Sequence, residues 1–265
     1  MKTTNRKKLI QRYYSARAKD YDQQKIRTWK TYQGFGTEIT DEMLETLKDW
    51  HGKTLLEIGV GSGRTALPTL EKIKPRVIGL DISKEMLMLA RKKASLLKTY
   101  IELVLGDADY LPFEEESFDA IVCMSTMHYF SNPKEKLRLL FRLLRQKGVF
   151  IYGDLTLHEK DENGFFDKLE CTISKVHARY YTPSQIKSLI EASGFRVSRM
   201  KTIAYRKSYR ALMEDKGEYF DIELETLLEL VRSAPAEARA QYELSDAELT
   251  QLYTVIFAMK EDPDW

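Results

Sequence analysis

Residues 55–65, LLEIGVGSGRT, decide the fold of this chain. An apolar run leads directly into a glycine-rich turn, and the residues after the turn have helical periodicity. A strand that enters such a turn and then a helix lets the backbone approach a ligand closely, with the first helical N–H groups directed at it. The stretch therefore predicts a strand, a turn and a helix with a ligand site at the turn.

The same alternation continues on both sides of this stretch. Short β-branched runs at 53–58, 76–81, 100–105, 118–124 and 148–154 enclose helical patterns at 63–73, 84–97 and 133–145. Further along, 182–192 is helical, and 195–204 and 252–259 have strand character. Strands that alternate with helices are typical of a parallel sheet covered by helices on both faces.

Two segments interrupt this alternation. Residues 156–181 are expected to contain one helix around 164–176, and residues 209–250 are rich in Glu and Leu. We divide the chain into an N-terminal helical lid (1–36), a core (37–204, with the insertion 156–181), a helical insertion (205–250), and a last strand and tail (251–265). Because the sequence has no internal repeat and no low-complexity segment, we expect one structural domain.

Composition excludes several classes of protein. The 265 residues include 42 Lys and Arg against 40 Asp and Glu, a net charge of +2 that is too small for a nucleic-acid binder. No apolar stretch approaches the roughly 20 residues that cross a bilayer, and the N-terminus has no signal-peptide pattern. With only two cysteines, we expect a cytoplasmic protein without disulfides.

The spacing of the glycines separates two kinds of cofactor. A dinucleotide fingerprint requires a third glycine at position 64, which is Arg64, and this disfavours an NAD-dependent oxidoreductase. The pattern is instead E-x-G-x-G-x-G, from Glu57 through Gly59 and Gly61 to Gly63. It resembles the first motif of class I S-adenosylmethionine-dependent methyltransferases. The resemblance implies a Rossmann-like, doubly wound, seven-stranded α/β sheet, mostly parallel with a last antiparallel strand and helical insertions as a cap. It also implies S-adenosylmethionine as cofactor and S-adenosylhomocysteine as product.

Three more segments agree with this resemblance. Asp81 ends the second strand, Asp107 and Ala108 follow the third, and residues 13–22, YYSARAKDYD, are similar to the cofactor lid of small-molecule methyltransferases. The family's K-P-G-G turn is replaced by Gln146-Lys147-Gly148. The resemblance covers residues 55–199, and the lid more weakly.

The family assigns roles to these positions. It implies that Glu57 holds the methionine ammonium, that Asp81 accepts the ribose hydroxyls, and that Asp107 and Ala108 meet the adenine. The other implied contacts are the turn Gly59, Gly61 and Gly63, the lid residue Tyr21, Ile82 and Met86 beside the adenine, and the Met124 carbonyl. Each position also has an ordinary explanation, such as a tight turn, a helix cap or core packing.

His128 is the titratable group that we expect beside the transferred methyl group. An imidazole suits removal of a proton from the acceptor, although it could equally be a binding contact. Asp154, His158 and Glu159 are further candidates near the end of the fifth strand.

The cysteines suggest no further chemistry. Cys123 lies within a strand, so we interpret it as a small buried side chain rather than a covalent nucleophile. Cys171 and His177 are six residues apart, a spacing that fits no helical face, and we therefore expect no metal site.

Aromatic side chains in the lid and the insertions favour an enclosed pocket for a small or medium organic acceptor. They are Tyr32, Phe35, Phe165, Phe166, Tyr180, Tyr181, Tyr209 and Tyr219. We expect no nucleic acid and no integral membrane association. Two different functions remain open: methylation of a ring carbon in a quinone or lipid, and a non-catalytic S-adenosylmethionine-binding partner subunit. The acceptor atom and the oligomeric state do not follow from the sequence.

Overall fold

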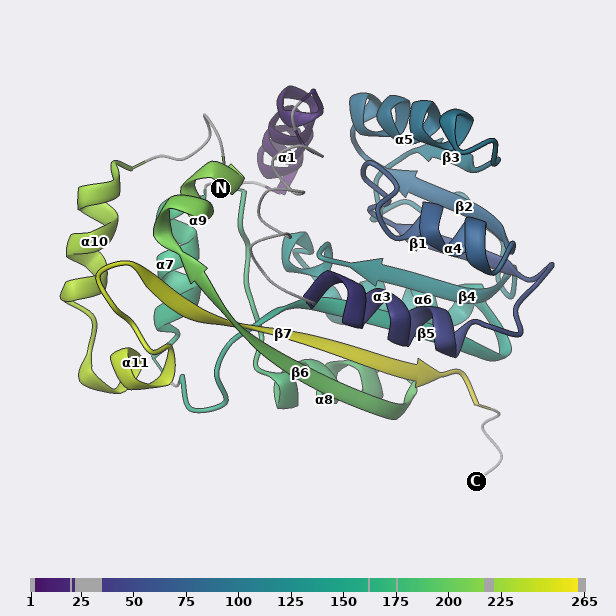
Figure 1. Cartoon of the computed structure of the whole chain (residues 1–265). Coiled ribbons are helices and arrows are strands. Elements are labelled where there is room, and N and C mark those ends of the chain that lie inside the picture. Colours follow the sequence, from purple (N-terminus) through teal and green to yellow (C-terminus); the bar gives the residue numbers. More distant parts are fainter. Residues whose placement is uncertain are drawn as a thin grey trace.

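The computed structural model describes residues 3–19, 21, 35–161, 163–174, 176–216 and 222–261. One seven-stranded sheet runs through its centre, with strand order β3-β2-β1-β4-β5-β7-β6 (Figure 1). The strands are β1 (Thr54–Ile58), β2 (Arg76–Asp81), β3 (Glu102–Leu105), β4 (Phe118–Met124), β5 (Leu144–Thr156), β6 (Arg196–Ser208) and β7 (Glu248–Met259). Only β7 runs antiparallel to its neighbours β5 and β6, so the predicted fold class is confirmed.

Helices cover both faces of the sheet and its carboxyl edge. They are α1 (Thr3–Arg17), α3 (Phe35–Thr46), α4 (Ala66–Lys72), α5 (Lys84–Leu96), α6 (Pro133–Leu143), α7 (Phe165–Ile173), α8 (Pro183–Glu191), α9 (Tyr209–Lys216), α10 (Leu224–Arg232) and α11 (Ala236–Gln241), with a short 3-10 helix, η1 (Met127–Tyr129). Among the described residues, no helix is long and apolar enough to cross a membrane.

Alternation along the strands divides the core in two. Leu55 of β1 packs in one buried cluster with side chains of α3, α4 and α5, such as Met43, Leu67 and Leu87. Leu56, the next residue, packs in the other cluster with side chains of α6 and α8. Successive strand residues point to opposite faces, so one short apolar run supplies both cores.

Several elements differ in length from the prediction. The helix expected from residue 63 begins at Ala66, because Gly63 has a φ of +80°, which an α-helix cannot contain. The helix expected to end at residue 145 ends at Leu143, because Leu144 already pairs with Phe118 in the sheet. Strands β6 and β7 also extend beyond their apolar stretches, since their pairing continues to Ser208 opposite Glu248.

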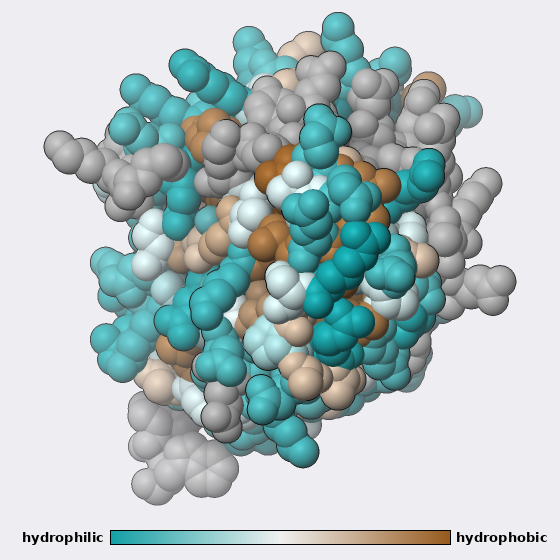
Figure 2. Space-filling model, turned by 90° about the vertical axis from the view of Figure 1, so that its left-hand side faces the viewer, coloured by the Kyte–Doolittle hydropathy of each residue, from teal (hydrophilic) through white to brown (hydrophobic). Residues whose placement is uncertain are grey.

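The two insertions pack against each other beyond the carboxyl ends of the parallel strands, where α7, α9, α10 and α11 form a separate lobe on the left of Figure 1. Their shared core includes Phe166, whose ring stacks on that of Tyr242 at 5.3 Å. Asp161 joins them further, because its carboxylate accepts hydrogen bonds from the Phe166 N–H and the Tyr242 hydroxyl. Figure 2 views this side of the molecule and shows apolar side chains in its centre with polar ones around them.

Helix α1 stands above the carboxyl edge of the sheet, between this lobe and α5 (Figure 1). Ile10 and Tyr13 of α1 pack on Val176, which follows α7. Most of the predicted lid beyond α1 lies outside the described residues.

Candidate active site

The glycine turn joins β1 to α4 at the carboxyl edge of the sheet. Gly59 and Gly61 have φ values of +73° and +52°, in the region that favours glycine. A Cβ atom on Gly59 would lie 2.2 Å from Oγ1 of Thr126, so the turn also needs glycine for space. The Gly59 N–H donates to the Leu80 carbonyl at 2.8 Å, which fixes the turn against β2.

Glu57 lies near the end of β1 with only 3% of its surface exposed. Its Oε2 atom has no hydrogen-bond partner among the described residues. Burial raises the pKa of this carboxyl to about 8, although a hydrogen bond from Thr65 and the charge of Arg64 act in the opposite direction. A buried carboxyl group with an unused oxygen is suited to a cationic ligand group.

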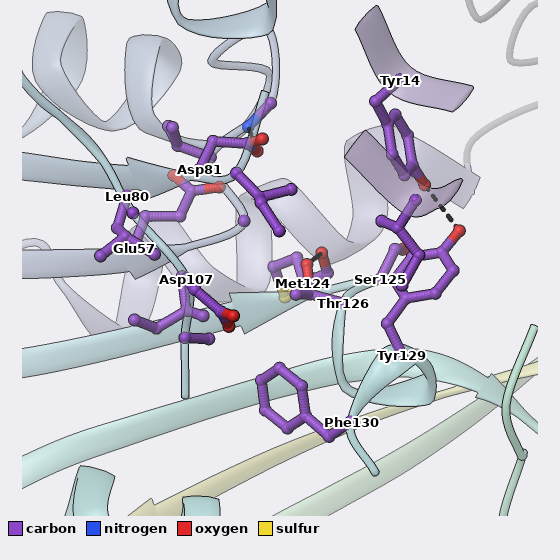
Figure 3. Close-up of a pocket in the computed structure, with 18 of the residues that line it drawn as sticks. Tyr14, Glu57, Leu80, Asp81, Asp107, Met124, Ser125, Thr126, Tyr129 and Phe130 are labelled. Atoms are coloured by element: carbon purple, nitrogen blue, oxygen red, sulfur yellow. Dashed lines mark hydrogen bonds between the residues drawn. The ribbon is translucent and has the colours of Figure 1, made fainter. Parts of the chain in front are cut away.

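Asp81 ends β2 and faces the same space as Glu57 (Figure 3). Its Oδ2 accepts the Gly61 N–H at 2.8 Å, and its Oδ1 accepts the Ser83 N–H at 2.8 Å. Burial raises the pKa of Asp81, while these backbone N–H groups oppose the rise. The carboxylate therefore connects the glycine turn to the start of α5.

Asp107 follows β3 and forms an ion pair with a lysine of α1. Lys7 of α1 places its Nζ 2.6 Å from Oδ2 of Asp107, and it also forms an ion pair with Asp109. Lys136 of α6 forms a second ion pair with Asp109 at 2.9 Å. These contacts attach α1 to the β3 end of the sheet edge.

Tyrosines close the opposite side of the space. The Tyr14 hydroxyl of α1 lies 2.7 Å from the Tyr129 hydroxyl of η1 (Figure 3). Burial raises the pKa of both groups well above the usual value, so both remain neutral phenols. The Tyr21 ring packs edge-on against Tyr14 at 6.2 Å.

One pocket joins these groups, and nine of the twelve predicted site residues line it. They are Tyr21, Glu57, Gly59, Gly61, Asp81, Ile82, Asp107, Ala108 and Met124. Gly63 and Met86 do not line the pocket. A Cβ atom on Gly63 would lie 3.0 Å from the Leu67 side chain, and Met86 is fully buried. Lining residues that the sequence did not indicate include Lys7, Ile10, Arg64, Thr126 and Phe130.

His128, the third predicted residue outside the lining, lies behind Tyr129, whose ring centroid is 3.9 Å from that of the imidazole. Its Nδ1 is 2.9 Å from both carboxylate oxygens of Asp154, and its backbone N–H also points to Asp154. Among the described residues, no hydrogen bond reaches Nε2. Asp154 therefore fixes the ring and leaves the second nitrogen available. His158 and Glu159 lie apart from this pair, since His158 accepts the Lys160 N–H and Glu159 binds Ser184.

Comparison with known families identifies the domain that contains most of this pocket. Residues 56–152, from β1 to β5, match the family described as a methyltransferase domain. The chain carries a class I S-adenosylmethionine-dependent methyltransferase domain. The glycine turn, Asp81 and Asp107 all belong to this methyltransferase domain, and S-adenosylmethionine is its cofactor.

Relatives of the methyltransferase share this core. An uncharacterized methyltransferase of Bacillus subtilis, YcgJ, is 29% identical over 156 residues, which are 57% of this chain and 60% of YcgJ. The crystal structure of YcgJ superposes with a TM-score of 0.77 at 23% identity, covering 84% of this chain and 98% of that one. A phthiotriol/phenolphthiotriol dimycocerosates methyltransferase of Mycobacterium tuberculosis is 33% identical over 111 residues, 42% of this chain and 40% of that protein. Both sequence alignments therefore cover less than two thirds of the relative.

A more distant likeness concerns a structure with bound ligands. Phosphoethanolamine N-methyltransferase 2 of Haemonchus contortus, in complex with S-adenosylhomocysteine, superposes with a TM-score of 0.57 at 18% identity, covering 84% of this chain and 53% of that one. This likeness shows a shared fold.

The residues of the methyltransferase pocket fit the cofactor. The unused Oε2 of buried Glu57 matches a primary ammonium group, and the Asp81 carboxylate can accept hydrogen bonds from vicinal hydroxyls. Ile82 and Ala108 add apolar surface to the same lining. The charged, polar and apolar groups in this lining are therefore compatible with the cofactor.

Two expectations about the insertions need correction. Phe166, Tyr180 and Tyr209 are buried in the core of the insertion lobe, and none of the expected aromatic side chains that the structure describes lines the pocket. Tyr32 and Tyr219, with the Phe35 side chain, lie outside the described part of the chain.

The second correction concerns Cys171 and His177. They do approach each other, together with Asp167, because the chain leaves α7 at Ile173 and turns back. The sequence interpretation set these residues aside because a spacing of six fits no helical face, but His177 lies beyond the end of α7 and approaches Cys171 from the following turn.

Proposed function

We propose that this methyltransferase transfers the methyl group of S-adenosylmethionine to a small or medium organic acceptor. The observation that carries this proposal is the position of α1 across the pocket. Lys7 binds Asp107 on one side, and Tyr14 meets Tyr129 on the other. A pocket covered in this way leaves room for a compact acceptor and not for a duplex or a folded protein surface.

In this proposal the cofactor lies along the carboxyl edge of the sheet. Glu57 binds the methionine ammonium, Asp81 binds the ribose hydroxyls, and Asp107 and Ala108 meet the adenine. Gly59 and Gly61 let the backbone pass close to the ligand. The Met124 carbonyl already accepts a hydrogen bond from Thr126 Oγ1 at 3.0 Å and has a second lone pair for the ammonium. Tyr21 covers the cofactor from the lid.

The bound cofactor supplies an electrophilic methyl group on a sulfonium, and the protein positions the acceptor relative to that group. Holding the acceptor in line with the methyl carbon and the sulfur contributes up to about 7–11 kcal/mol in favourable systems. The apolar and aromatic residues on the α1 side, Ile10 and Tyr14 among them, exclude water from this line.

His128 is our candidate for the group that accepts the acceptor's proton. Asp154 binds Nδ1, so the tautomer with a proton on Nδ1 directs a basic Nε2 away from the carboxylate. Because Tyr129 separates the ring from the pocket, an acceptor that uses His128 must extend past Tyr129.

The acceptor class is open between small polar molecules and lipid or quinone rings. The mycobacterial relative is named for a phthiotriol/phenolphthiotriol dimycocerosates substrate, and its aligned part covers 42% of this chain. This relation supports testing lipid acceptors beside small phenols, amines, thiols and carboxylates.

The test is a turnover assay with the full chain. The protein is incubated with S-adenosylmethionine and each acceptor class, and both S-adenosylhomocysteine and the methylated product are measured by mass spectrometry. We expect product with at least one class of compact acceptor, and its loss in Asp81→Asn. Saturable cofactor binding without product from any class would instead favour the non-catalytic binding subunit.

A further inference from the structure

A second group of chemically active side chains lies outside the methyltransferase pocket. Asp167 and Cys171 are four residues apart on α7 and therefore share one face of the helix. His177 returns to this face after a turn in which its N–H donates to the Ser174 carbonyl. One potential ligand atom from each residue lies within 4.8 Å of the others.

We propose that Asp167, Cys171 and His177 form a binding site for a zinc-class divalent metal ion. Carboxylate oxygen, thiolate sulfur and imidazole nitrogen are the three ligand types that Zn²⁺ takes from proteins, at about 2.0–2.3 Å. Ligands at these distances in a tetrahedron are about 3.3–3.8 Å apart. The three ligand atoms lie within 4.8 Å of one another and belong to one helix and the turn that follows it, so side-chain adjustment alone is needed to reach this spacing.

The histidine is already placed for such a role. Its side chain is 2% exposed, and its Nε2 lies 2.7 Å from Oδ1 of Asp167. Its buried Nδ1 has no hydrogen-bond partner among the described residues, so the surrounding chain does not satisfy this ring completely. A buried imidazole with an unsatisfied nitrogen, close to a carboxylate and a thiol, is unusual for a group whose only role is packing.

The carboxylate has the support that metal ligands commonly have. The Tyr180 backbone N–H donates to Oδ1 of Asp167 at 2.7 Å, which fixes the orientation of the carboxylate. Glu170, the residue before Cys171, is 1% exposed but does not belong to the cluster of three. Cys171 is exposed, so an ion can enter from solvent.

This site has a structural consequence for His128. The backbone N–H groups of Ala178 and Arg179, which follow His177, donate to the His128 carbonyl at 3.2 and 3.3 Å. The imidazole rings of His128 and His177 are 5.9 Å apart. A metal ion that joins α7 to residue 177 therefore stabilises the segment behind η1. The proposal concerns this cluster alone and does not depend on the acceptor.

Cobalt is the probe for the first experiment. The full-length protein is treated with a chelator, dialysed and titrated with Co²⁺ and then Zn²⁺, with absorbance as the readout. We expect one equivalent of Co²⁺ to give a thiolate-to-cobalt charge-transfer band and tetrahedral visible bands, which Zn²⁺ removes. Cys171→Ser should abolish the charge-transfer band. It should also weaken Zn²⁺ binding by about 100-fold or more, since loss of an outer-shell partner alone costs about 10- to 100-fold.

Matched controls separate this site from surface binding. His51→Gln alters an exposed histidine that is absent from the cluster, and we expect unchanged titrations. Cys123 remains in Cys171→Ser, so a charge-transfer band that persists in this variant would overturn the proposal. Failure of the unmodified protein to bind Co²⁺ stoichiometrically would do the same.

A second measurement needs no variant. Cys171 is exposed and Cys123 is buried, so an alkylating reagent should modify Cys171 first in the native protein. We expect stoichiometric Zn²⁺ to slow alkylation of Cys171, measured by peptide mapping, at least tenfold. An alkylation rate that Zn²⁺ leaves unchanged contradicts the metal site even if the variants fail to fold.

Discussion

The Nδ1 atom of His128 lies 2.9 Å from both carboxylate oxygens of Asp154. Asp154 is 1% exposed, and its Oδ1 and Oδ2 also accept the backbone N–H groups of Leu155 and His128 respectively. The carboxylate thus fixes both the ring and the backbone of η1. In our proposal this makes Asp154 a positioning residue, since it acts through His128.

We predict that Asp154→Asn lowers kcat by roughly 10- to 100-fold, within the about 10²–10⁴-fold contribution of a general base. The amide keeps the shape of the side chain but weakens its preference for an N–H on Nδ1. The Kd for S-adenosylhomocysteine should change little, so the substitution should lower kcat without weakening cofactor binding. Glu159→Gln, which alters a carboxylate beyond β5 that binds Ser184, is the control and should retain full turnover. Equal losses of turnover and cofactor affinity in Asp154→Asn would mean that Asp154 only maintains the fold of the pocket.

Gly59 provides a test of the turn. In Gly59→Ala the new methyl group meets Thr126 Oγ1 at 2.2 Å, and the residue keeps a φ of +73°. The left-handed backbone costs about 1–2 kcal/mol and the overpacking about 1–3 kcal/mol, so stability falls and cofactor binding weakens. Gly52→Ala is a matched control, with a φ of +74° and nothing within 4 Å of the new atom. It should show the backbone cost alone in urea unfolding, and an equal loss in both variants would contradict the close contact at Thr126.

Glu57 gives the ligand-free protein a specific pH dependence. Its pKa is about 8 in the folded state and near 4.5 in the unfolded chain, so the folded state binds more protons between these values. The Glu57 contribution to stability is therefore lost as pH rises from about 4.5 to about 8, by about 1.4 kcal/mol per unit. Glu57→Gln removes this loss. We expect the stability of the variant relative to the unmodified protein to increase with pH over this range in urea unfolding, and a constant difference would contradict the raised pKa.

The same group predicts proton release on binding. A methionine ammonium beside Glu57 favours the carboxylate, so S-adenosylhomocysteine should release about one proton at pH 7. Calorimetry in phosphate and in Tris then gives different heats, because the buffers take up the proton with different enthalpies. Glu57→Gln should remove the difference and weaken binding. Identical heats in the two buffers for the unmodified protein would place the ammonium elsewhere.

Lys7 tests whether α1 retains the cofactor. Its ion pairs with Asp107 and Asp109 are partly exposed and contribute about 1 kcal/mol, so Lys7→Met should speed S-adenosylhomocysteine dissociation roughly fivefold. Lys8, the next residue, is exposed, and Lys8→Met is the control. Stopped-flow displacement measures both rates. A rate in Lys7→Met equal to that of the control would show that α1 is held by other contacts.

The part of the site at the ends of strands could be predicted from the sequence. Parallel strands bring their carboxyl ends to one edge, so Glu57, Asp81 and Asp107 had to meet once the strands were located. The turn glycines could also be predicted, because their spacing is a local feature of the sequence. Among the predicted contacts, Met86 and Gly63 lie outside the pocket because helical and turn geometry points them into the protein.

Contacts between distant segments could not be predicted. Lys7 reaches Asp107 across 100 positions, and Tyr14 reaches Tyr129 across 115. His128 and Asp154 were separate candidates, and no local pattern joins them. The extent of β6 and β7 also depends on their mutual pairing. Lys207 near the end of β6 and Glu248 at the start of β7 are charged and give no apolar signal.

A crystal structure of the protein with S-adenosylhomocysteine tests the proposed cofactor position most directly. We predict the ligand at the carboxyl edge of the sheet, with its ribose hydroxyls on Asp81, its ammonium beside Oε2 of Glu57, and its adenine against Ile82 and Ala108. A ligand bound elsewhere, or reversed so that the adenine lies beside Glu57, would contradict this account of the site.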